Sequence, residues 1–308
     1  MLFRSNYIED QIMMYCRQNS TLPILRLEYT GSAYERLKTE AADEVDVMIV
    51  LKTTKSEVVV EDSGVPGYRR LKARPESVFR KYASAEGYID PERLRNGWFY
   101  SLVDQAISNY RARSPRSEVN MMVRAHGPAV QLDIFKKATG EKLVSADLVP
   151  FFQIGPNNDY VARPYTGRRH VSRSDLLWRQ SFTLKEKGIL EHMDRDHGCR
   201  HELLRIVKTI VKRNPTSLGS LDSYHLKTAF MHYMNKGGQN WVSDNALGTH
   251  FLGFLGALQS YLERGYLPHY WLPGVNLLED INQIVIKNTA DRLKRILNSE
   301  TEMNKILA

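Results

Sequence analysis

Residues 30–51 read TGSAYERLKTEAADEVDVMIVL, and this stretch decides the fold. Gly31 and Ser32 form a tight-turn signal after an apolar run, and helical composition follows, so the stretch predicts a strand, a turn and a helix. Backbone N–H groups at the start of such a helix, with the Ser32 hydroxyl, can bind a triphosphate. The run VDVMIVL then has the Val and Ile content of a buried strand.

Two carboxylates stand at the start of that second strand. Glu44 lies thirteen residues after Gly31 and Asp46 follows at i+2, so the period of a strand places both side chains on one face. Adjacent carboxylates repel unless a cation lies between them, and Mg²⁺ binds such oxygens together with substrate phosphates. A third acid from a neighbouring strand would complete a two-metal site, and Asp133 and Asp147 are the candidates. An isolated acid pair more often marks a strand edge, but its combination with the glycine turn favours phosphoryl chemistry.

Patterns on either side of this stretch predict an α+β chain. Residues 6–19 carry apolar side chains at helical spacing, and residues 76–113 predict a helix interrupted near Asp90 and Pro91. Short Val- and Ile-rich runs predict strands at 24–30, 57–62, 120–127, 129–138 and 142–154. From residue 174 onward only helical patterns remain, at 175–193, 202–214, 223–236, 247–265 and 278–297. We therefore expect a mixed β-sheet core with flanking helices, followed by a C-terminal helical lobe.

The composition favours an ordered protein of a reducing compartment. Hydrophobic residues make up 42% and charged residues 25% of the 308 residues, which excludes a disordered chain. An excess of 43 Lys and Arg over 35 Asp and Glu gives a net charge of +8, which favours polyanionic partners, although solubility alone also accounts for it. Cys16 and Cys199 are too few for a disulfide-rich secreted design, and the charged N-terminal stretch fits neither a signal peptide nor a membrane span. We expect a cytoplasmic protein.

Several blocks resemble the cGAS-like receptors, a family of the nucleotidyltransferase superfamily whose best-known member is cyclic GMP-AMP synthase. The blocks are TGS (30–32), DEVDVMIVL (43–51), GPAVQLDI (127–134), VSADLVPFF (144–152), WRQSFTLKEKGIL (178–190), SYHLKTAFMH (223–232) and YLPHYWLPGVNLL (266–278). They follow the family's order over nearly the whole chain. The resemblance implies a bilobal nucleotidyltransferase fold, with residues 1–165 as the core lobe including an N-terminal spine helix, residues 166–308 as the helical lobe, and an active site in the cleft.

The resemblance also implies site residues. It selects Asp147 as the third ligand beside Glu44 and Asp46 for Mg²⁺ or Mn²⁺, and leaves Asp133 as an ordinary strand residue. Nucleotide contacts are implied for Thr30, Gly31 and Ser32 with the triphosphate, Arg179, Ser181 and Thr183 with one base, Lys208 with a phosphate, and Ser223, Tyr224 and Lys227 with the ribose, base and phosphate of the other nucleotide. A guanidinium fork suits a base edge and a tyrosine ring stacks on any base, although a lone Tyr or Lys on a helix is usually packing or solvated surface.

The activity implied is that of a cyclic dinucleotide synthase in innate immune signalling. Such an enzyme joins two nucleoside triphosphates, ATP, GTP or others, releases pyrophosphate and is activated by nucleic acid. All three acids that the family's chemistry needs are present. Two alternatives share the fold: a catalytically silent nucleotide-binding scaffold, and a non-cyclising nucleotidyltransferase that extends RNA.

The prediction of the activator depends on residues 191–204, which stand where cyclic GMP-AMP synthase carries a zinc-binding loop called the thumb. Cyclic GMP-AMP synthase builds its thumb from one His and three Cys, whereas the same place here reads EHMDRDHGCRHELL (191–204). His192, His197, Cys199 and His201 could supply four ligands, but structural zinc sites usually hold at least two thiolates, so we expect solvated loop histidines. Without a thumb, double-stranded RNA is favoured over double-stranded DNA as the activator. Two copies of the chain could bind the nucleic acid as a dimer. The basic residues predicted to contact the duplex are Arg4, Arg17, Lys38, Arg205 and Lys212.

Overall fold

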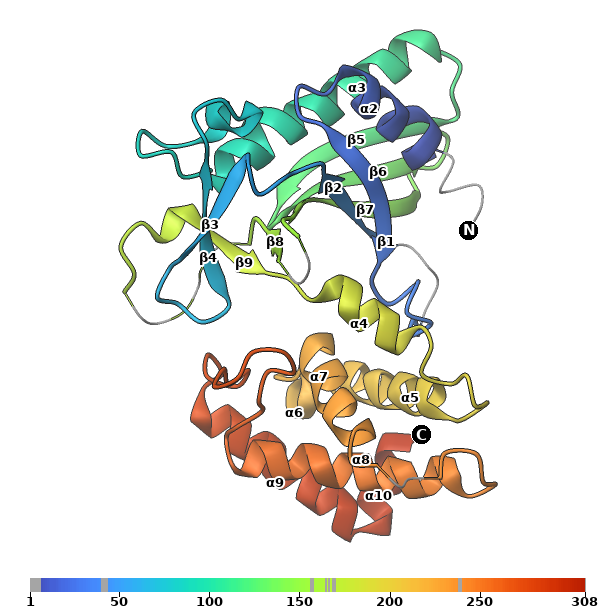
Figure 1. Cartoon of the computed structure of the whole chain (residues 1–308). Coiled ribbons are helices and arrows are strands. Elements are labelled where there is room, and N and C mark those ends of the chain that lie inside the picture. The colour runs from blue at the N-terminus through green and yellow to red at the C-terminus, as the bar shows by residue number, and fades with distance from the viewer. Residues whose placement is uncertain are drawn as a thin grey trace. The chain divides into compact units, whose positions relative to one another are not determined.

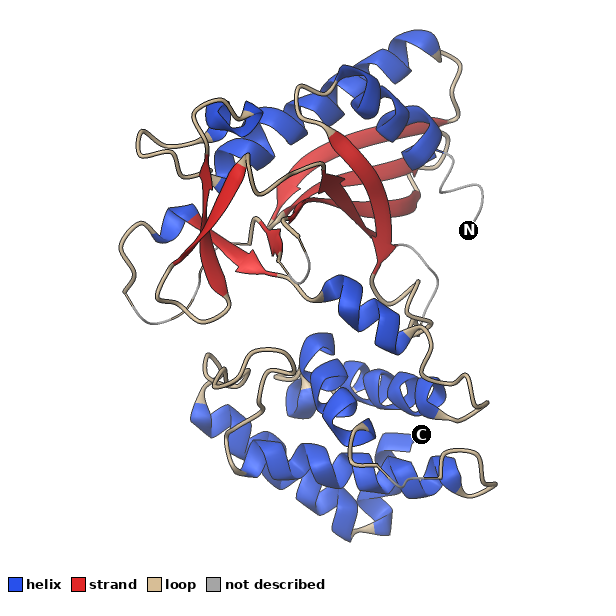
Figure 2. Ribbon diagram, in the orientation of Figure 1, coloured by secondary structure: helices blue, strands red, loops and turns tan. Residues whose placement is uncertain are grey.

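The structure is a computed structural model that describes residues 7–39, 44–155, 158–163, 165, 167, 170–237 and 240–307. Its contacts divide the chain into two compact units, Met1–Glu35 with Ala41–Lys187, and Arg36–Glu40 with Gly188–Ala308. Every strand among the described residues belongs to the first unit, and the second is helical (Figure 2). We call them the αβ unit and the helical unit.

A nine-stranded mixed sheet forms the frame of the αβ unit. Its strands are β1 (Ile24–Thr30), β2 (Glu44–Leu51), β3 (Val58–Asp62), β4 (Tyr68–Ala73), β5 (Val119–His126), β6 (Ala129–Lys136), β7 (Lys142–Gln153), β8 (Asp159–Val161) and β9 (Leu177–Gln180). The order is β1-β2-β7-β8-β9-β4-β3, and β5 joins through β6 to β7. Strands β2 and β7 are parallel, and the other pairs are antiparallel. The predicted α+β class with a mixed sheet is confirmed.

Helices cover one face of this sheet, where α2 and α3 lie along the strands (Figure 1). The helical segments of the unit are η1 (Tyr7–Met13), α2 (Met14–Asn19), η2 (Val78–Tyr82), η3 (Arg93–Tyr100), α3 (Ser101–Arg113), η4 (Ser174–Leu176) and the start of α4 (Thr183–Leu190). Ile12 and Cys16 are fully buried in the same core as Val47 and Ile49 of β2. The predicted amphipathic opening helix is confirmed, because its apolar stripe packs on the sheet.

The helical unit contains α5 (Arg200–Arg213), α6 (Pro215–Leu218), α7 (Ser223–Met234), α8 (Ala246–Glu263), α9 (Gln283–Asn298) and α10 (Glu300–Leu307). Apolar residues of α5 recur at helical spacing, as Leu203, Val207 and Ile210 show, and they form one core with α7, α8 and α9. Leu37 from the separate segment Arg36–Glu40 is fully buried in that core. Among the described residues, none of the helices is both long enough and apolar enough to cross a membrane.

Two predictions of local structure are wrong. The helix expected after the Gly31 turn is absent from residues 32–39, where the amides of Tyr34 and Glu35 both donate to the Gly31 carbonyl at 3.0 Å and Arg36, at φ 59°, ends the turn. The helix dipole invoked for triphosphate binding therefore does not form there.

The second error concerns strands with weak signals. Residues 177–180, expected to be helical, form β9 between β8 and β4, so the sheet extends beyond the predicted lobe limit at residue 165. Strand β4 reads YRRLKA and was not expected at all. Four residues are too few to show a period, and β4 carries Arg and Lys where an apolar run would have marked a strand.

Candidate active site

Strand register brings two of the predicted metal ligands together. The parallel pairing of β2 with β7 places Asp46 directly opposite Asp147. Thr30 of β1 pairs with Asp46, Gln131 of β6 pairs with Asp147, and Arg124 of β5 pairs with Gln131. Because directly paired residues point to the same face of a sheet, these five side chains form a row across five strands. We call it the polar row.

The polar row lies on the face of the sheet opposite the helix-covered core. Val47 and Leu148, which follow Asp46 and Asp147 in sequence, are fully buried in that core, and side chains alternate along a strand. Thr30 is 1% exposed, and its buried Oγ1 has no hydrogen-bond partner among the described residues. A buried hydroxyl without a partner is costly, so this atom marks a place where a polar ligand would fit.

A hydrogen-bond chain fixes the orientation of Asp147. Gln131 Nε2 donates to Asp147 Oδ1 at 2.8 Å, and Arg124 Nε donates to Gln131 Oε1 at 2.6 Å. Gln131 is only 5% exposed, whereas the Asp147 side chain keeps 14%. Asp133 accepts a hydrogen bond from Ser145 Oγ at 2.5 Å, and its Oδ2 lies 3.6 Å from a guanidinium nitrogen of Arg124. Reasoning from sequence missed Gln131 and Arg124, which only the pairing of β5, β6 and β7 identifies.

The backbone at Gly31 lies close to the Asp46 carboxylate. Its φ is +79°, in the region that favours glycine. A Cβ at this position would lie 2.0 Å from Asp46 Oδ2, far inside any allowed contact. The turn that follows β1 therefore brings backbone next to Asp46. Backbone groups this close to a carboxylate would suit a site that binds a phosphate through a metal ion.

The donor set has the chemistry that Mg²⁺ or Mn²⁺ selects. Glu44 begins β2 two residues before Asp46, opposite Ser145, so it shares the face of the polar row. Carboxylate oxygens with an unpartnered hydroxyl nearby suit a hard cation and its bound phosphates. Within the described part of the chain, no group of three His, Cys, Asp or Glu side chains is close enough to hold an ion. The three-carboxylate ligand set thus stays a prediction.

The residues predicted to read one base lie at the junction of β9 and α4. Ser181 Oγ and Thr183 Oγ1 are 3.1 Å apart, and the Ser181 amide donates to the Asp159 carbonyl at 2.8 Å. Arg179 pairs with Val161 of β8, which in turn pairs with Phe151 of β7. Phe151 is four residues after Asp147 on the same strand, so Arg179 points to the face that carries the polar row.

The remaining predicted nucleotide contacts belong to the helical unit. Lys208 on α5 donates from Nζ to the Leu37 carbonyl at 3.1 Å. Ser223 is the exposed first residue of α7, and Tyr224 and Lys227 follow one turn apart, both half-buried. The structure therefore places Ser223, Tyr224 and Lys227 together at one end of α7.

His269 holds the ring of Tyr224 and was missed by sequence reasoning. The hydroxyl of Tyr224 lies 3.1 Å from His269 Nε2. His269 Nδ1 accepts the backbone N–H groups of Trp271 and Leu272 at 3.0 and 3.3 Å, so Nε2 carries the proton and donates to the tyrosine. His269 is 7% exposed, and it belongs to the block YLPHYWLPGVNLL, which was the signal available in the sequence.

A charged cap begins the helix that carries these residues. The Asp222 carboxylate accepts the amides of Tyr224 and His225 at 2.9 and 2.8 Å. Burial opposes its charge, but the hydrogen bonds and the charge of His225 prevail and lower the pKa of Asp222 to about 2. Burial likewise opposes the charged imidazole, yet Asp222 raises the pKa of His225. The pair holds the first turn of α7 in place.

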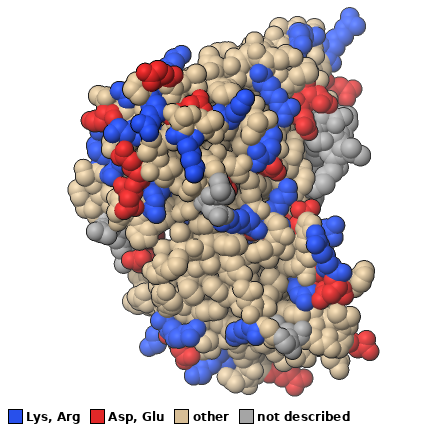
Figure 3. All heavy atoms as spheres, viewed as in Figure 1, with Lys and Arg blue, Asp and Glu red and all other residues tan. Residues whose placement is uncertain are grey.

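The predicted nucleic-acid contacts are spread over both units. Arg4 lies outside the described residues, and Arg17 is exposed on α2. On α5, Arg205 and Lys212 are exposed two turns apart, and Arg205 and Lys38 line one pocket of about 380 Å³ together with Arg213. On the visible face of the αβ unit, basic and acidic side chains of the described residues are interspersed (Figure 3).

Ion pairs organise the loop at the place of the zinc thumb. Asp194 accepts the amides of Arg200 and His201 at 2.9 and 2.8 Å, and its Oδ2 lies 2.6 Å from His201 Nδ1. Arg200 also binds Asp196, and its guanidinium lies 4.8 Å from the centre of the Trp241 ring. The expectation that all the histidines of this loop are solvated is wrong for His201, which is 8% exposed, because the carboxylate of Asp194 draws it inward.

Family descriptions and curated relatives match the chain over most of its length. The Mab-21 protein nucleotidyltransferase domain matches residues 33–192, and the Mab-21 protein HhH/H2TH-like domain matches residues 199–295. The chain is 55% identical to cyclic GMP-AMP synthase-like receptor 3 of Stylophora pistillata, over 98% of this chain and 89% of that protein. It is 28% identical to mitochondrial dynamics protein MID51 of Danio rerio (83% of this chain, 56% of that protein) and 26% identical to a cyclic GMP-AMP synthase-like receptor of Trichogramma pretiosum (89% and 62%).

Proposed function

The chain belongs to the cGAS-like receptors of the Mab-21 nucleotidyltransferase family, and from this membership we propose that it joins two nucleoside triphosphates into a cyclic dinucleotide when nucleic acid binds. The observation that carries the proposal is the pairing of Asp46 with Asp147 beside the Gly31 turn and the unpartnered Thr30 hydroxyl. A scaffold that only binds nucleotides has no need of two adjacent carboxylates, because their mutual repulsion costs stability.

The αβ unit supplies the groups for the chemical step. Glu44, Asp46 and Asp147 would hold Mg²⁺ or Mn²⁺, which when bound neutralises charge on the phosphates. The Gly31 turn with Thr30 and Ser32 receives the triphosphate. In each of two rounds, a ribose hydroxyl forms a new O–P bond at an α-phosphorus, the α–β phosphoanhydride bond breaks, and pyrophosphate leaves. Asp147, whose carboxylate is hydrogen-bonded by Gln131, would accept the proton of the attacking hydroxyl.

The other proposed contacts select and orient the two nucleotides. Arg179 offers a guanidinium fork to a base edge, and the hydroxyls of Ser181 and Thr183 lie beside it in sequence. The Tyr224 ring, held by His269, offers a stacking surface for the other base. Lys208 and Lys227 contribute positive charge for phosphates. After the first bond forms, the linear intermediate must turn around before the second bond closes the ring.

For the activator we propose double-stranded RNA, bound through the exposed basic residues of α2 and α5. Arg205, Lys38 and Arg213 surround one pocket on the helical unit, with Glu202 as the acid in its lining. Phosphates of a duplex are bound mainly by such charges, and A-form RNA is recognised by shape. At the place of the zinc thumb, Asp194 and Arg200 hold the loop together instead of zinc-binding cysteines. This difference supports double-stranded RNA over DNA as the activator. We propose that this takes place in the cytoplasm.

The second candidate is a catalytically silent nucleotide-binding scaffold. The observation that favours it is the relative at 28% identity whose name refers to mitochondrial dynamics rather than to nucleotide synthesis. A non-cyclising RNA nucleotidyltransferase is the third.

One assay distinguishes the three candidate functions. Purified protein is incubated with four labelled nucleoside triphosphates, Mg²⁺ or Mn²⁺, and double-stranded RNA or DNA. A phosphatase-resistant dinucleotide supports the proposal, long RNA products support the RNA-extending enzyme, and no product with any duplex supports the scaffold. A parallel reaction with Asp147→Asn should yield no dinucleotide, whereas Asp62→Asn, which changes an exposed acid of β3, should leave the yield unchanged.

A further inference from the structure

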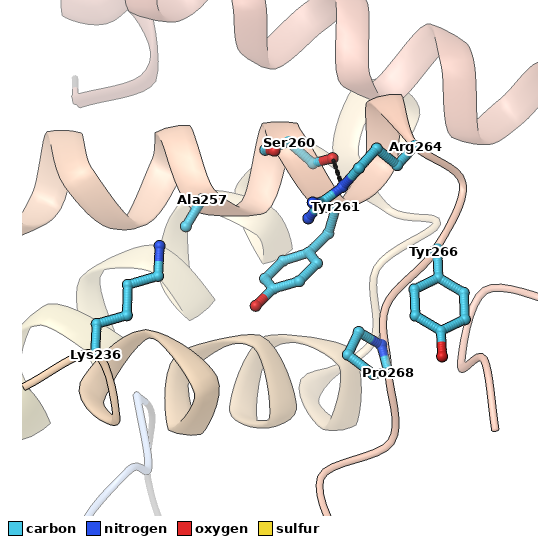
Figure 4. Close-up of a pocket in the computed structure, with 7 residues that line it drawn as sticks. All are labelled: Lys236, Ala257, Ser260, Tyr261, Arg264, Tyr266 and Pro268. Carbon is cyan, nitrogen blue, oxygen red and sulfur yellow. Dashed lines mark hydrogen bonds between the residues drawn. The ribbon is translucent and has the colours of Figure 1, made fainter. Parts of the chain in front are cut away.

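The helical unit contains a second pocket, of about 450 Å³, that no step above uses. The end of α8 supplies Tyr261 and Arg264, the segment after it supplies Tyr266 and Pro268, and Lys236 comes from the chain just after α7. Figure 4 shows Lys236 and Arg264 at opposite sides, with Tyr261 between them. The volume is that of pockets that bind small molecules.

The two cations of this pocket are not neutralised by an acid. Arg264 Nε donates to the Ser260 carbonyl at 3.1 Å, and the Lys236 ammonium lies 5.8 Å from the centre of the Tyr233 ring. Both side chains are exposed, and neither makes an ion pair within the part of the chain that the structure describes. Two positive charges facing one pocket without a carboxylate favour an anion, above all one with several oxygen acceptors.

The rings of Tyr261 and Tyr266 line the same pocket, and Tyr261 packs against two neighbouring side chains. The Arg264 guanidinium lies 5.3 Å from the centre of the Tyr261 ring, and the centres of the His232 and Tyr261 rings are 6.2 Å apart. His232 is held in turn by the Pro268 carbonyl, 2.9 Å from its Nε2. Burial raises the pKa of Tyr261, so its phenol stays neutral and does not repel an anion. Tyr266 is 42% exposed, so part of its ring is available for stacking.

We propose that this pocket binds a small anion that carries a planar ring, the chemistry of a nucleoside monophosphate. The phosphate would lie between Lys236 and Arg264, and the base against Tyr266. This site is distinct from Ser223 and Tyr224, which the proposed reaction uses, and its existence does not depend on that reaction.

Binding is tested on the full-length chain with two of the proposed substrate contacts removed and no divalent metal present. Ser223→Ala/Tyr224→Ala protein in EDTA is titrated with AMP, GMP, adenosine and inorganic phosphate by calorimetry. We expect saturable binding of AMP or GMP, weaker binding of adenosine and of phosphate, and at least a tenfold loss of nucleotide affinity on adding Lys236→Ala/Arg264→Gln. The matched control Lys294→Ala/Arg295→Gln changes two exposed cations of α9 outside the pocket and should leave the affinity unchanged.

A second variant tests the ring. Tyr266→Ser alters an exposed side chain, so the fold should survive, as thermal unfolding would verify. It should weaken AMP binding while leaving phosphate binding as it was. Unchanged nucleotide affinity in Lys236→Ala/Arg264→Gln overturns the site. Inorganic phosphate that binds as tightly as AMP overturns the ring-bearing ligand.

Discussion

Asp46 on β2 lies directly opposite Asp147 on β7, in the parallel pair of a sheet whose other described pairs are antiparallel. Two carboxylates at this spacing repel each other, so without a cation they weaken the pairing that brings them together. This geometry is what a bound metal would stabilise, and it leads to the first prediction.

Glu44→Gln together with Asp46→Asn should abolish dinucleotide synthesis, to below about 1% of the wild-type rate, because the loss of charged ligands removes transition-state stabilisation. The protein should not unfold, since removing repelling carboxylates rarely costs stability when no metal is bound. Product analysis and thermal unfolding measure both effects. Glu61→Gln/Asp62→Asn on β3 is the control, and undiminished product from the Glu44/Asp46 variant would contradict the mechanism.

Gln131→Leu should lower kcat about tenfold with little change in KM, because Asp147 loses the hydrogen bond that orients it while the substrate contacts remain. Steady-state kinetics with saturating duplex separate the two constants. Gln153→Leu, on β7 of the same sheet but outside the polar row, removes a comparable amide that is hydrogen-bonded to Asp159. Equal losses in both variants would show that Gln131 acts through stability alone.

Gly31→Ala should abolish activity, whereas Gly140→Ala should not. Both glycines have positive φ, +79° and +71°, so backbone strain should cost about 1–2 kcal/mol of stability in either variant. A Cβ at Gly140 meets open space, but one at Gly31 collides with Asp46 Oδ2. Chemical denaturation gives the stability difference and the synthase assay gives activity. If both variants stay active, the close contact at Asp46 has no role in the site.

Charge reversal at Lys212 or Arg17 should reduce RNA-stimulated activity and spare basal turnover. Each lost phosphate contact should also reduce the slope of log affinity against log salt by about one. Binding titrations at several salt concentrations measure that slope, with Lys294→Glu on α9 as the control. Product yield that is the same with and without every duplex tested would show that another ligand, or none, controls the enzyme.

The cap of α7 should make stability depend on pH in two regions. Asp222 has a lowered pKa of about 2, so its contribution is present above its ordinary pKa of 3.8 and is lost as pH falls toward 2. His225 has a raised pKa, so its contribution is complete below 6.5 and is lost as pH rises through the raised value. Thermal unfolding should show the cap strongest between about pH 4 and 6.5. Asp222→Asn keeps a capping side chain but should lose both dependences relative to the wild type, and an unaltered pH profile would rule out the ion pair.

The sequence predicted those parts of the fold whose signals are local. Apolar periodicity identified the opening helix, and Val- and Ile-rich runs identified β1, β2, β3, β5, β6 and β7. It failed at β4, β8 and β9, where strand formation depends on neighbours in the sheet rather than on composition. It also failed at the Gly31 turn, because Arg36 leaves the helical region and no local rule anticipates that.

For the candidate site, the sequence signals pointed to the acids but not to the side chains that hold the predicted residues in place. Acid spacing and family blocks identified Asp46 and Asp147, which the structure brings together. Gln131 and His269 were missed because each acts through a partner distant in sequence, Asp147 in one case and Tyr224 in the other. Such roles appear only when register and loop geometry are known.

The parallel pairing of β2 with β7 also orders events during synthesis of the chain. Parallel strands cannot pair through a hairpin, and here β3 to β6, with their helices, intervene between the two partners. A nascent chain that has emerged only as far as β6 therefore carries Asp46 without its opposite carboxylate. Contacts this distant in sequence form late and slowly, so a truncated product has no complete acid pair.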